Sequence, residues 1–375
     1  MKVNYSYVYL AFFLLLNIFN FVDRNLLIAF APQIKSEFNL TNVQWGLLTG
    51  VYFLFFYSVF GIFMGVLGDK FSRMKIAAAG VFLWSLMTAF TGVAKNFSHL
   101  IVARALIGVG ESALTPNAIS MLSDLFKQNQ RGTASAIYYL GIPLGVGFGM
   151  LIAAFFGPAY GWRSVFITLG LIGMGLGILT YFLLEPRRGQ LDISFDVDNK
   201  STSIRDITSM TKHALYNSRC LTFVIIGSIF LHIPLGAGNF EVLWAVNERG
   251  FTASSYNSLF GIFFILGGTV GAVLGGVLSD RISHYFKGGV MTFLVISYLI
   301  LTPLTISYRF ISPETNFFYL TLFFVSFNVT FFYGPVFASV QELTPVKVRS
   351  TMVAVFILGL RIDLYLFDLV VITII

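Results

Sequence analysis

This sequence has little charge and almost no cysteine. Only 11% of its 375 residues are charged, whereas soluble proteins average about 25%. The single cysteine, Cys220, excludes a disulfide within the chain and leaves no cysteine pair for a metal site. Because 57% of the residues are hydrophobic and the mean hydropathy is +0.82, we expect most of the chain to lie in a lipid bilayer.

The motifs of common enzyme classes are also missing. No Gly-rich stretch ends in Gly-Lys-Ser or Gly-Lys-Thr, which argues against transport driven by ATP. No serine stands in a Gly-x-Ser-x-Gly motif, and no His or Cys residues have the spacing of metal ligands. We therefore expect no enzyme activity, no cofactor and no bound metal. The net charge is +7, and most of the positive residues lie in the short connections between apolar segments. This distribution is not that of a nucleic-acid-binding surface, so we expect no nucleic-acid partner.

What the sequence has in abundance is apolar segments long enough to cross a bilayer as helices. Most of the 24 Lys and Arg residues fall in connections on one side of these segments, and this bias places the N-terminus in the cytoplasm. The first run has only Lys2 before it and no small-residue cleavage site after it, so we expect a span and no signal peptide. The eleven expected spans lie near residues 7–31, 45–67, 75–94, 98–122, 132–157, 164–184, 220–243, 254–279, 288–307, 316–340 and 351–375.

A polar break after the sixth span predicts two helical bundles joined by a linker. Residues 1–184 form the N-terminal six-helix bundle, residues 185–218 a cytoplasmic linker with one short helix, and residues 219–375 an incomplete C-terminal bundle. The linker opens with Glu185-Pro186, and the proline ends the preceding helix.

A short motif recurs at the end of the second span of each bundle. Gly65-Val-Leu-Gly68-Asp69-Lys70 ends the first copy, and Gly276-Val-Leu-Ser279-Asp280-Arg281 ends the second. The two halves are therefore predicted to be parallel repeats that each start in the cytoplasm, an arrangement known from transporters.

Four charged residues fall within spans of the first bundle, namely Asp23, Arg24, Arg104 and Glu111. A charge at bilayer depth costs at least about 2.5 kcal/mol, so such residues are rare and usually functional. We expect Asp23 to pair with one arginine and Glu111 to compete for Arg104, so that a carboxylate can take up and release a proton. The alternative is a fixed ion pair that orders the first and fourth helices.

These motifs resemble those of the major facilitator superfamily. The finer resemblance is to its spinster-like branch, although organic-anion symporters of the superfamily share some of the same features. The segments that carry the resemblance are Gly65-x-x-Gly68-Asp69-Lys70-x-Ser72-Arg73-x-Lys75, Asp23-Arg24, Arg104-x-x-x-Gly108-x-Gly110-Glu111-Ser112, Ser123-Asp124-Leu125-Phe126, Ile142–Gly149 and Gly161-Trp162-Arg163.

The resemblance implies an all-α polytopic membrane protein with the major facilitator fold, in which two pseudo-symmetric bundles expose a site near the midplane alternately to either side. It implies a secondary active transporter, coupled to protons through the four buried charges, that moves an amphipathic anionic or lipid-like substrate. An organic-anion (carboxylate)/proton symporter of the same fold is the alternative. We expect a monomer in the inner membrane of a bacterium.

In the superfamily, the signature loop acts as a cytoplasmic latch in which the Asp holds neighbouring helix ends and basic residues bridge to carboxylates. The resemblance implies such a role here, with Asp124 as a candidate partner; the alternative is simple retention of positive charge in the cytoplasm. The residues assigned to gating are Gly65, Gly68, Asp69, Lys70, Arg73, Asp124, Asp280 and Arg281.

Aromatic residues make up 17% of the chain and predict an apolar wall for a substrate cavity, although packing is the alternative for each one. The residues expected to contact substrate are Arg104, Glu111, Tyr52, Tyr57, Tyr138, Asn328, Phe332 and Tyr333. Pro143 stands among glycines in Ile142–Gly149, which predicts either a hinge or close packing against span 254–279.

Beyond residue 360 the chain departs from the superfamily pattern. Arg361, Asp363 and Asp368 add charge to the last expected span, and a twelfth helix is missing. The sequence is compatible with a truncated chain, with a reading frame altered near residue 360, or with a complete protein of eleven helices. A non-transporting membrane sensor or an inactive remnant is therefore the alternative from another functional class.

Overall fold

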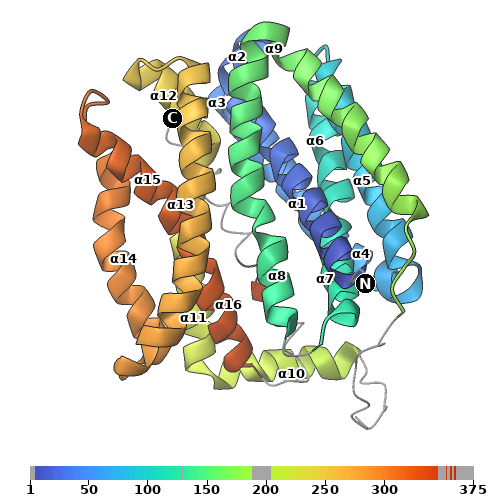
Figure 1. Cartoon of the computed structure of the whole chain (residues 1–375), viewed down its shortest axis with the longest axis vertical. Coiled ribbons are helices and arrows are strands. Elements are labelled where there is room, and N and C mark those ends of the chain that lie inside the picture. Colours follow the sequence, from blue (N-terminus) through green and yellow to red (C-terminus); the bar gives the residue numbers. More distant parts are fainter. Residues whose placement is uncertain are drawn as a thin grey trace. The chain divides into compact units, whose positions relative to one another are not determined.

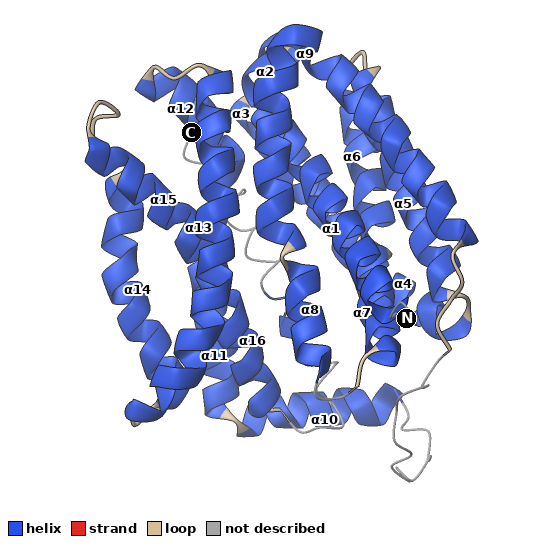
Figure 2. Cartoon of the chain, in the orientation of Figure 1, coloured by secondary structure: helices blue, strands red, loops and turns tan. Residues whose placement is uncertain are grey.

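The computed structural model describes residues 5–127, 130–187 and 204–344, together with residues 352, 355, 356 and 359. Every regular element in this part of the chain is a helix (Figure 2). The predicted all-α class is therefore confirmed. The helices labelled in Figure 1, with three short elements between them, are α1 (Tyr5–Ala29), α2 (Ala31–Phe38), α3 (Asn42–Gly46), the π-helical turn η1 (Leu47–Val51), α4 (Tyr52–Lys70), α5 (Arg73–Gly92), α6 (Phe97–Ser112), α7 (Leu114–Leu125), α8 (Arg131–Tyr139), α9 (Gly141–Phe182), α10 (Ile204–Asn217), α11 (Arg219–Gly236), the 3-10 turn η3 (Ala237–Phe240), α12 (Glu241–Arg249), α13 (Ala253–Ile282), the 3-10 turn η4 (Ser283–Tyr285), α14 (Gly289–Ser307), α15 (Asn316–Phe331) and α16 (Tyr333–Glu342).

Three of the expected spans each begin with one helix and continue as another, with the change at the same place relative to a proline. The helices that end there are α6, α8 and α15, and each ends four residues before the proline. Proline has no N–H to donate to the carbonyl four residues earlier, so the helix divides at that carbonyl. The pairs of last helical residue and proline are Ser112 with Pro116, Tyr139 with Pro143, and Phe331 with Pro335.

Two expected spans, near 132–157 and 164–184, meet within α9 at a sharp turn. Gly161 has φ 75° and ψ 158°, outside the helical region, so α9 consists of two helices joined at this residue. A positive φ with an extended ψ is open to glycine and strained for other residues.

The described chain divides into two compact units. The first holds α1–α9, α12 and the start of α13, and the second holds α10, α11, the rest of α13 and α14–α16. The bundles predicted from the sequence differ from this division, because Asn239–Gly261 groups with the first unit. The Asn257 side chain donates to the carbonyl of Ala29 (2.9 Å), and Trp45 Nε1 donates to the carbonyl of Asn239 (2.9 Å).

Glycines of α6 bring it close to two neighbours in the first unit. A Cβ placed on Gly110 would lie 2.7 Å from the carbonyl oxygen of Gly80 in α5. A Cβ on Gly108 would lie 2.6 Å from the carbonyl oxygen of Phe53 in α4. Neither position has room for a side chain, so α6 approaches both helices at the level of its buried charges.

Among the glycines that the structure describes, Gly261 makes the close packing expected between the fifth and eighth spans. A Cβ on Gly261, near the start of α13, would lie 2.8 Å from the carbonyl of Gly147 in α9. Other glycines of these spans face different helices, since Gly145 lies against Ile18 of α1 and Gly271 lies against α15. For those glycines the expected packing partner was wrong, because the sequence shows small residues but not which helix they face.

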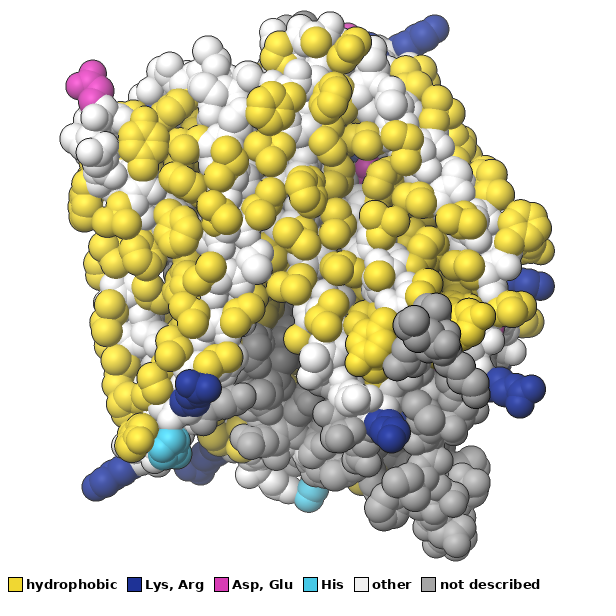
Figure 3. Space-filling model, viewed as in Figure 1, with side chains coloured by type: hydrophobic (Ala, Val, Ile, Leu, Met, Phe, Trp, Pro, Cys, Tyr) yellow, Lys and Arg dark blue, Asp and Glu magenta, His cyan; other side chains and the backbone are white. Residues whose placement is uncertain are grey.

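Seven helices in the described residues have the length and composition needed to cross a membrane, and two shorter apolar helices lie at Arg219–Phe230 and Asn316–Phe331. On the face shown in Figure 3, hydrophobic side chains cover the length of the helices, and the Lys and Arg side chains in view lie near helix ends. The short helix expected in the linker is α10. The charges of the last expected span, Arg361, Asp363 and Asp368, lie outside the described residues.

Candidate functional site

An ion pair between α1 and α6 forms the centre of the first unit. Arg24 Nε donates to Glu111 Oε2 at 2.5 Å. Glu111 is 1% exposed and Arg24 is 8% exposed. Removing one partner of a pair this buried leaves an uncompensated charge, which is strongly destabilising. The two residues therefore depend on each other.

Aromatic rings of α4 contact both buried arginines. The Arg24 guanidinium carbon lies 4.7 Å from the centre of the Tyr57 ring and 4.9 Å from that of Phe53. The Arg104 guanidinium carbon lies 4.4 Å from the centre of the same Phe53 ring. A desolvated cation–π contact contributes about 2 kcal/mol. Phe53 thus stabilises two guanidinium groups without adding negative charge.

Asp23 and Arg104 form no ion pair within the described residues. Thr88 Oγ1 donates to Asp23 Oδ2 at 3.2 Å, while Asp23 Oδ1 and Arg104 Nε are buried without a hydrogen-bond partner there. The expected pairing of Asp23 with an arginine, and of Glu111 with Arg104, is wrong, because Arg24 takes Glu111. Neighbouring residues point about 100° apart on a helix, which turns Asp23 toward α5 and Arg24 toward α4 and α6.

The other residues expected to contact substrate in the first unit have different surroundings. Tyr57 lies with Arg24, as described above, and Tyr52 is half-buried five residues earlier on α4. Tyr138 of α8 is fully buried, and its hydroxyl lies 3.2 Å from that of Thr115. The four charges and Tyr57 are therefore close together, and Tyr138, whose hydroxyl contacts Thr115 of α7, lies within electrostatic reach of Tyr57 and Arg24.

In the second unit, the expected substrate residues lie on α15, on α16 and at the turn between these helices. Asn328 is half-buried, with its Oδ1 enclosed and without a hydrogen-bond partner among the described residues. Phe332 is 2% exposed in the hydrophobic core of the unit, with its ring 6.2 Å from that of Tyr298 and 5.7 Å from that of Tyr333. Phe332 therefore serves the core of this unit, and Tyr333 packs at its edge.

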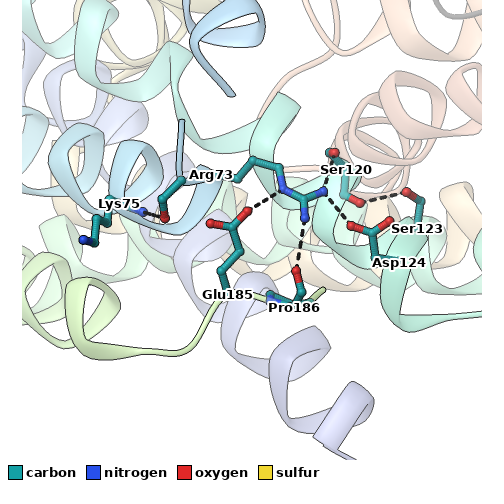
Figure 4. Close-up of polar contacts among 8 residues, drawn as sticks. Arg73, Lys75, Ser120, Ser123, Asp124, Glu185 and Pro186 are labelled. Carbon is teal, nitrogen blue, oxygen red and sulfur yellow. Dashed lines mark hydrogen bonds and ion pairs between the residues drawn. The ribbon is translucent and has the colours of Figure 1, made fainter. Parts of the chain in front are cut away.

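A second buried arginine cluster lies where α5 begins. Arg73 Nη1 donates to Asp124 Oδ2 (2.6 Å) and to Ser120 Oγ (2.9 Å), and Arg73 Nε donates to Glu185 Oε1 (2.9 Å). Arg73 Nη2 donates to the carbonyl of Pro186 (3.2 Å). Figure 4 shows the fork of Arg73 between α7 and the segment that leaves α9. This one side chain therefore joins three segments, including the candidate partner Asp124.

The carboxylate of Glu185 titrates differently from a free glutamate. Partial burial by itself raises the pKa of Glu185, but hydrogen bonds from Ser72 and Arg73 outweigh it, so the pKa lies below its ordinary value. The carboxylate therefore stays ionised, and paired with Arg73, at neutral pH.

The remaining residues assigned to gating differ in their contacts. Gly68 is buried, and a Cβ on it would lie 2.3 Å from the side-chain oxygen of Asn117 on α7. Gly65 has open space around its Cβ position, and the Lys70 and Arg281 side chains are exposed. Asp69 and Asp280 lie on α4 and α13, but their side chains fall outside what the structure describes.

A third cluster joins the opposite ends of the helices in the first unit. Glu37 of α2 accepts from Trp162 Nε1 (2.8 Å) and Arg163 Nη2 (2.6 Å), and Arg163 Nη1 also donates to the carbonyls of Gly92 (3.0 Å) and Ala94 (2.8 Å). Slight burial raises the pKa of Glu37, but the bonds from Arg163 and Trp162 and the charge of Arg163 together lower it overall. We call this end of the first unit the Glu37 end, and the end at Arg73 the Arg73 end.

Sequence reasoning missed two residues of the central cluster, Phe53 and Thr88. Phe53 stands four residues before Tyr57 and so shares its helix face, which is a signal that could have found it. Thr88 has no comparable signal, because a single hydroxyl in an apolar helix is common. Glu37 was also missed, because a single carboxylate near a helix end is usually exposed to water and does not by itself indicate a buried contact.

Comparisons with known proteins agree with this architecture. The model of the Major Facilitator Superfamily matches residues 13–362. Protein spinster of Drosophila melanogaster is 28% identical over 278 residues, which cover 70% of this chain and 44% of that protein. The sphingosine-1-phosphate transporter SPNS2 of Danio rerio is 29% identical over 273 residues, covering 70% of this chain and 54% of that protein. The chain therefore spans about half the length of these curated relatives.

A solved structure shares the fold. The crystal structure of a bacterial homolog of the human lysosomal transporter Spinster, in an inward-facing and unoccupied conformation, has a TM-score of 0.82 and 23% sequence identity. The match covers 97% of this chain and 80% of that chain. With the family match over most of its length, and with its many apolar helices, this chain is an integral multi-pass membrane protein that belongs to the Major Facilitator Superfamily, a family of transporters and not of enzymes, and it resembles the spinster-like members.

Proposed function

We propose that this protein is a proton-coupled secondary transporter that moves an amphipathic anionic, lipid-like substrate by alternating access. The observation that carries the proposal is Arg104, a guanidinium that is 6% exposed and has no carboxylate partner in the described chain, beside Asp23 and the Arg24–Glu111 pair. A buried cation of this kind is costly unless a further negative charge reaches it. An anionic headgroup would supply that charge.

The four charges also provide a reason for coupling. With both carboxylates ionised, the two acids and two arginines sum to zero net charge. Protonation of Asp23 or Glu111 leaves one positive charge in excess, which favours binding of an anion near Arg104. Binding of a proton and binding of an anionic substrate are thereby linked, and each favours the other.

The amphipathic character of the substrate rests on two supports. One relative is named a sphingosine-1-phosphate transporter, and such a molecule has a charged head and an apolar chain. The rings that surround the arginines, Phe53 and Tyr57, would accept apolar groups next to the head. A small carboxylic acid would use the arginines alone.

Transport by purified full-length protein in proteoliposomes tests the proposal. Uptake of labelled sphingosine-1-phosphate or a lysophospholipid would be compared with uptake of a small carboxylate such as lactate, with and without an imposed pH gradient. We expect the pH gradient to drive uptake of the long-chain anion, and we expect Asp23→Asn and Glu111→Gln to abolish this pH dependence. Glu314→Gln, at an exposed glutamate of the second unit, is the matched control.

Each other outcome has a distinct meaning. Uptake of lactate alone would assign the chain to the organic-anion symporters. Unchanged pH-driven uptake in both carboxylate variants would show that the proton-coupling proposal is wrong. Absence of transport for every probe in the unaltered protein would favour the sensor or inactive remnant.

The same proposal places the protein as a monomer in a bacterial inner membrane with its Arg73 end in the cytoplasm. The Arg73 cluster would then hold the cytoplasmic helix ends together in one state of the transport cycle and release them in another. Labelling of single introduced cysteines by a membrane-impermeant reagent in spheroplasts tests the orientation. Cysteines near Arg163 should react and those near Lys70 should not.

A further inference from the structure

A small cavity lies inside the first unit, next to the two charges that have no ionic partner. Its volume, counted as the space open to the centre of a water-sized sphere, is about 10 Å³. This is about the least space that holds one water molecule. Its lining includes Asp23, Leu27, Thr91, Leu100, Arg104 and Phe166.

The position of the cavity along the helices is set by its lining. Leu27 stands two residues before the end of α1, Thr91 one residue before the end of α5, and Leu100 three residues after the start of α6. These three helix ends belong to the Glu37 end of the first unit. The cavity therefore lies between Asp23 and the Glu37 end, on the side away from the Arg73 cluster.

Two buried polar atoms on the lining residues are without hydrogen-bond partners in the described chain. They are Asp23 Oδ1, an acceptor with the indole N–H of Trp84 nearby but outside hydrogen-bond distance, and Arg104 Nε, a donor. A third lining group, the hydroxyl of Thr91, donates to the carbonyl of Met87 and keeps a lone pair free to accept. A buried water commonly makes two to four hydrogen bonds to groups of this kind. A metal cation would be repelled by the guanidinium of Arg104, so water fits the site and a cation does not.

We propose that this cavity binds one water molecule, which bridges Asp23 and Arg104 and passes protons to Asp23 from the Glu37 end within the first unit. Arg104 has five N–H donors, so the water and a substrate anion can bind it together. This inference rests on the proposed proton coupling, and it names the route that the proton takes.

The proton step conserves atoms and charge. A hydronium on the Glu37 side gives one proton to the bound water and becomes a neutral water. The bound water gives one of its own protons to Asp23 Oδ1 and so remains a neutral water. The charged groups that act on Asp23 from the neighbouring helix α6 are Arg104 and Glu111, and Arg24 lies beside it on α1. Helix α5 faces it with Thr88 and Trp84, which are uncharged, and α9 supplies Phe166 to the cavity.

Infrared spectroscopy of the full-length protein in lipid tests the proposal without a substrate. The C=O stretch of a buried protonated carboxylic acid is followed after a rapid drop in pH, and the band that disappears in Asp23→Asn is assigned to Asp23.

Leu100→Phe should fill the cavity and slow the rise of this band by roughly tenfold, equivalent to a barrier about 1.4 kcal/mol higher. Leu100→Ala should enlarge the cavity and leave the rate equal or faster. A sharp water O–H band that shifts in oxygen-18 water should be present in the unaltered protein and lost in Leu100→Phe.

The controls separate a water path from general damage. Leu86→Phe makes the same change on α5 at a leucine that is 39% exposed, and it should leave rate and band unchanged. Equal slowing in Leu100→Phe and Leu100→Ala, an unaltered rate in Leu100→Phe, or a band that depends on sodium would each overturn the proposal. If Asp23→Asn ends pH-driven uptake while Leu100→Phe protonates normally, the water path is wrong and the coupling stands. If Asp23→Asn has no effect on uptake, the proposed function itself fails.

Discussion

The two buried arginine clusters of the first unit are similar in burial but differ in how many of their polar atoms have hydrogen-bond partners. Arg73 is 4% exposed and Arg24 is 8% exposed. Arg73 has four oxygen acceptors, which include two carboxylates, whereas Arg24 shares a cluster with one carboxylate partner, Glu111, and with the rings of α4. In the central cluster, Arg104 and Asp23 also keep polar atoms without partners in the described residues.

This difference distinguishes a clamp from a site that can change its partners. Moving Arg73 would break several charge-assisted hydrogen bonds together, so one arrangement is strongly preferred. In the central cluster, a proton, a water or an anion can complete the bonding in more than one way at similar cost. The under-satisfied cluster is therefore the place for coupling, and the saturated cluster is the place for holding the fold.

The largest effect is expected from breaking the central pair. Glu111→Ala leaves Arg24 buried with no carboxylate, which should cost about 3–5 kcal/mol of stability and abolish transport. Replacing both partners, Arg24→Met with Glu111→Leu, should restore most of the stability and none of the transport. Thermal unfolding followed by size-exclusion chromatography and uptake in proteoliposomes measure the two quantities. Recovery of transport in the double variant would mean that the pair is only structural.

A milder change in the Arg73 cluster should lower stability but leave substrate binding nearly unchanged. Arg73→Lys keeps the charge but cannot reach four acceptors with a planar fork, so we expect a loss of about 2–3 kcal/mol from bonds to charged groups. Binding of a substrate to the central cluster should change little. The exposed Lys70 is the control, because surface substitutions stay within about 0.5 kcal/mol. An equal loss in Lys70→Ala would show that charge on the loop, and not the fork, is what matters.

A backbone change should separate α4 from the arginines. Gly108→Ala puts a Cβ against the carbonyl of Phe53, and the overpacking should cost about 1–3 kcal/mol. It should also shift Phe53 relative to Arg104 and weaken uptake. The control is Gly175→Ala on α9, where the Cβ position is open, and where stability should rise by up to about 1 kcal/mol. A stable and fully active Gly108→Ala would contradict the close approach.

The smallest effect is expected from acid. The pKa of Glu185 is lowered in the folded protein, so its contribution is complete above the ordinary glutamate pKa of about 4.3 and is lost as pH falls through the lower folded pKa. Glu185→Gln should therefore flatten the fall in melting temperature on the acid side and leave the fall toward alkaline pH unchanged. Glu37→Gln should act in the same direction but by less, because Glu37 is 44% exposed and such pairs contribute at most about 1 kcal/mol. A larger change in the acid-side fall of the melting temperature for Glu37→Gln than for Glu185→Gln would contradict this prediction.

Much of the fold follows from the sequence, because hydrophobic length and proline position are local properties. The all-α class, the long apolar helices and the burial of the four charges are confirmed. The division into two parallel repeats stays a prediction. The pairing of those charges was not, since it depends on the rotation of α1 that turns Asp23 toward Thr88 and Arg24 toward Glu111. The partners of Gly145 and Gly271 also depended on which helices are neighbours, and no local pattern encodes that.

The π-helical turn Leu47–Val51 comes immediately before Tyr52 and Phe53 in the chain. A π turn holds about one residue more than an α turn, and one residue corresponds to about 100° of rotation on an α-helix. If this turn tightened to α geometry while Asn42–Gly46 stayed in place, α4 would rotate about its own axis and carry Phe53 away from Arg104. The extra residue in this turn therefore sets the rotation of α4 about its own axis, and so determines which face of α4 contacts the arginines.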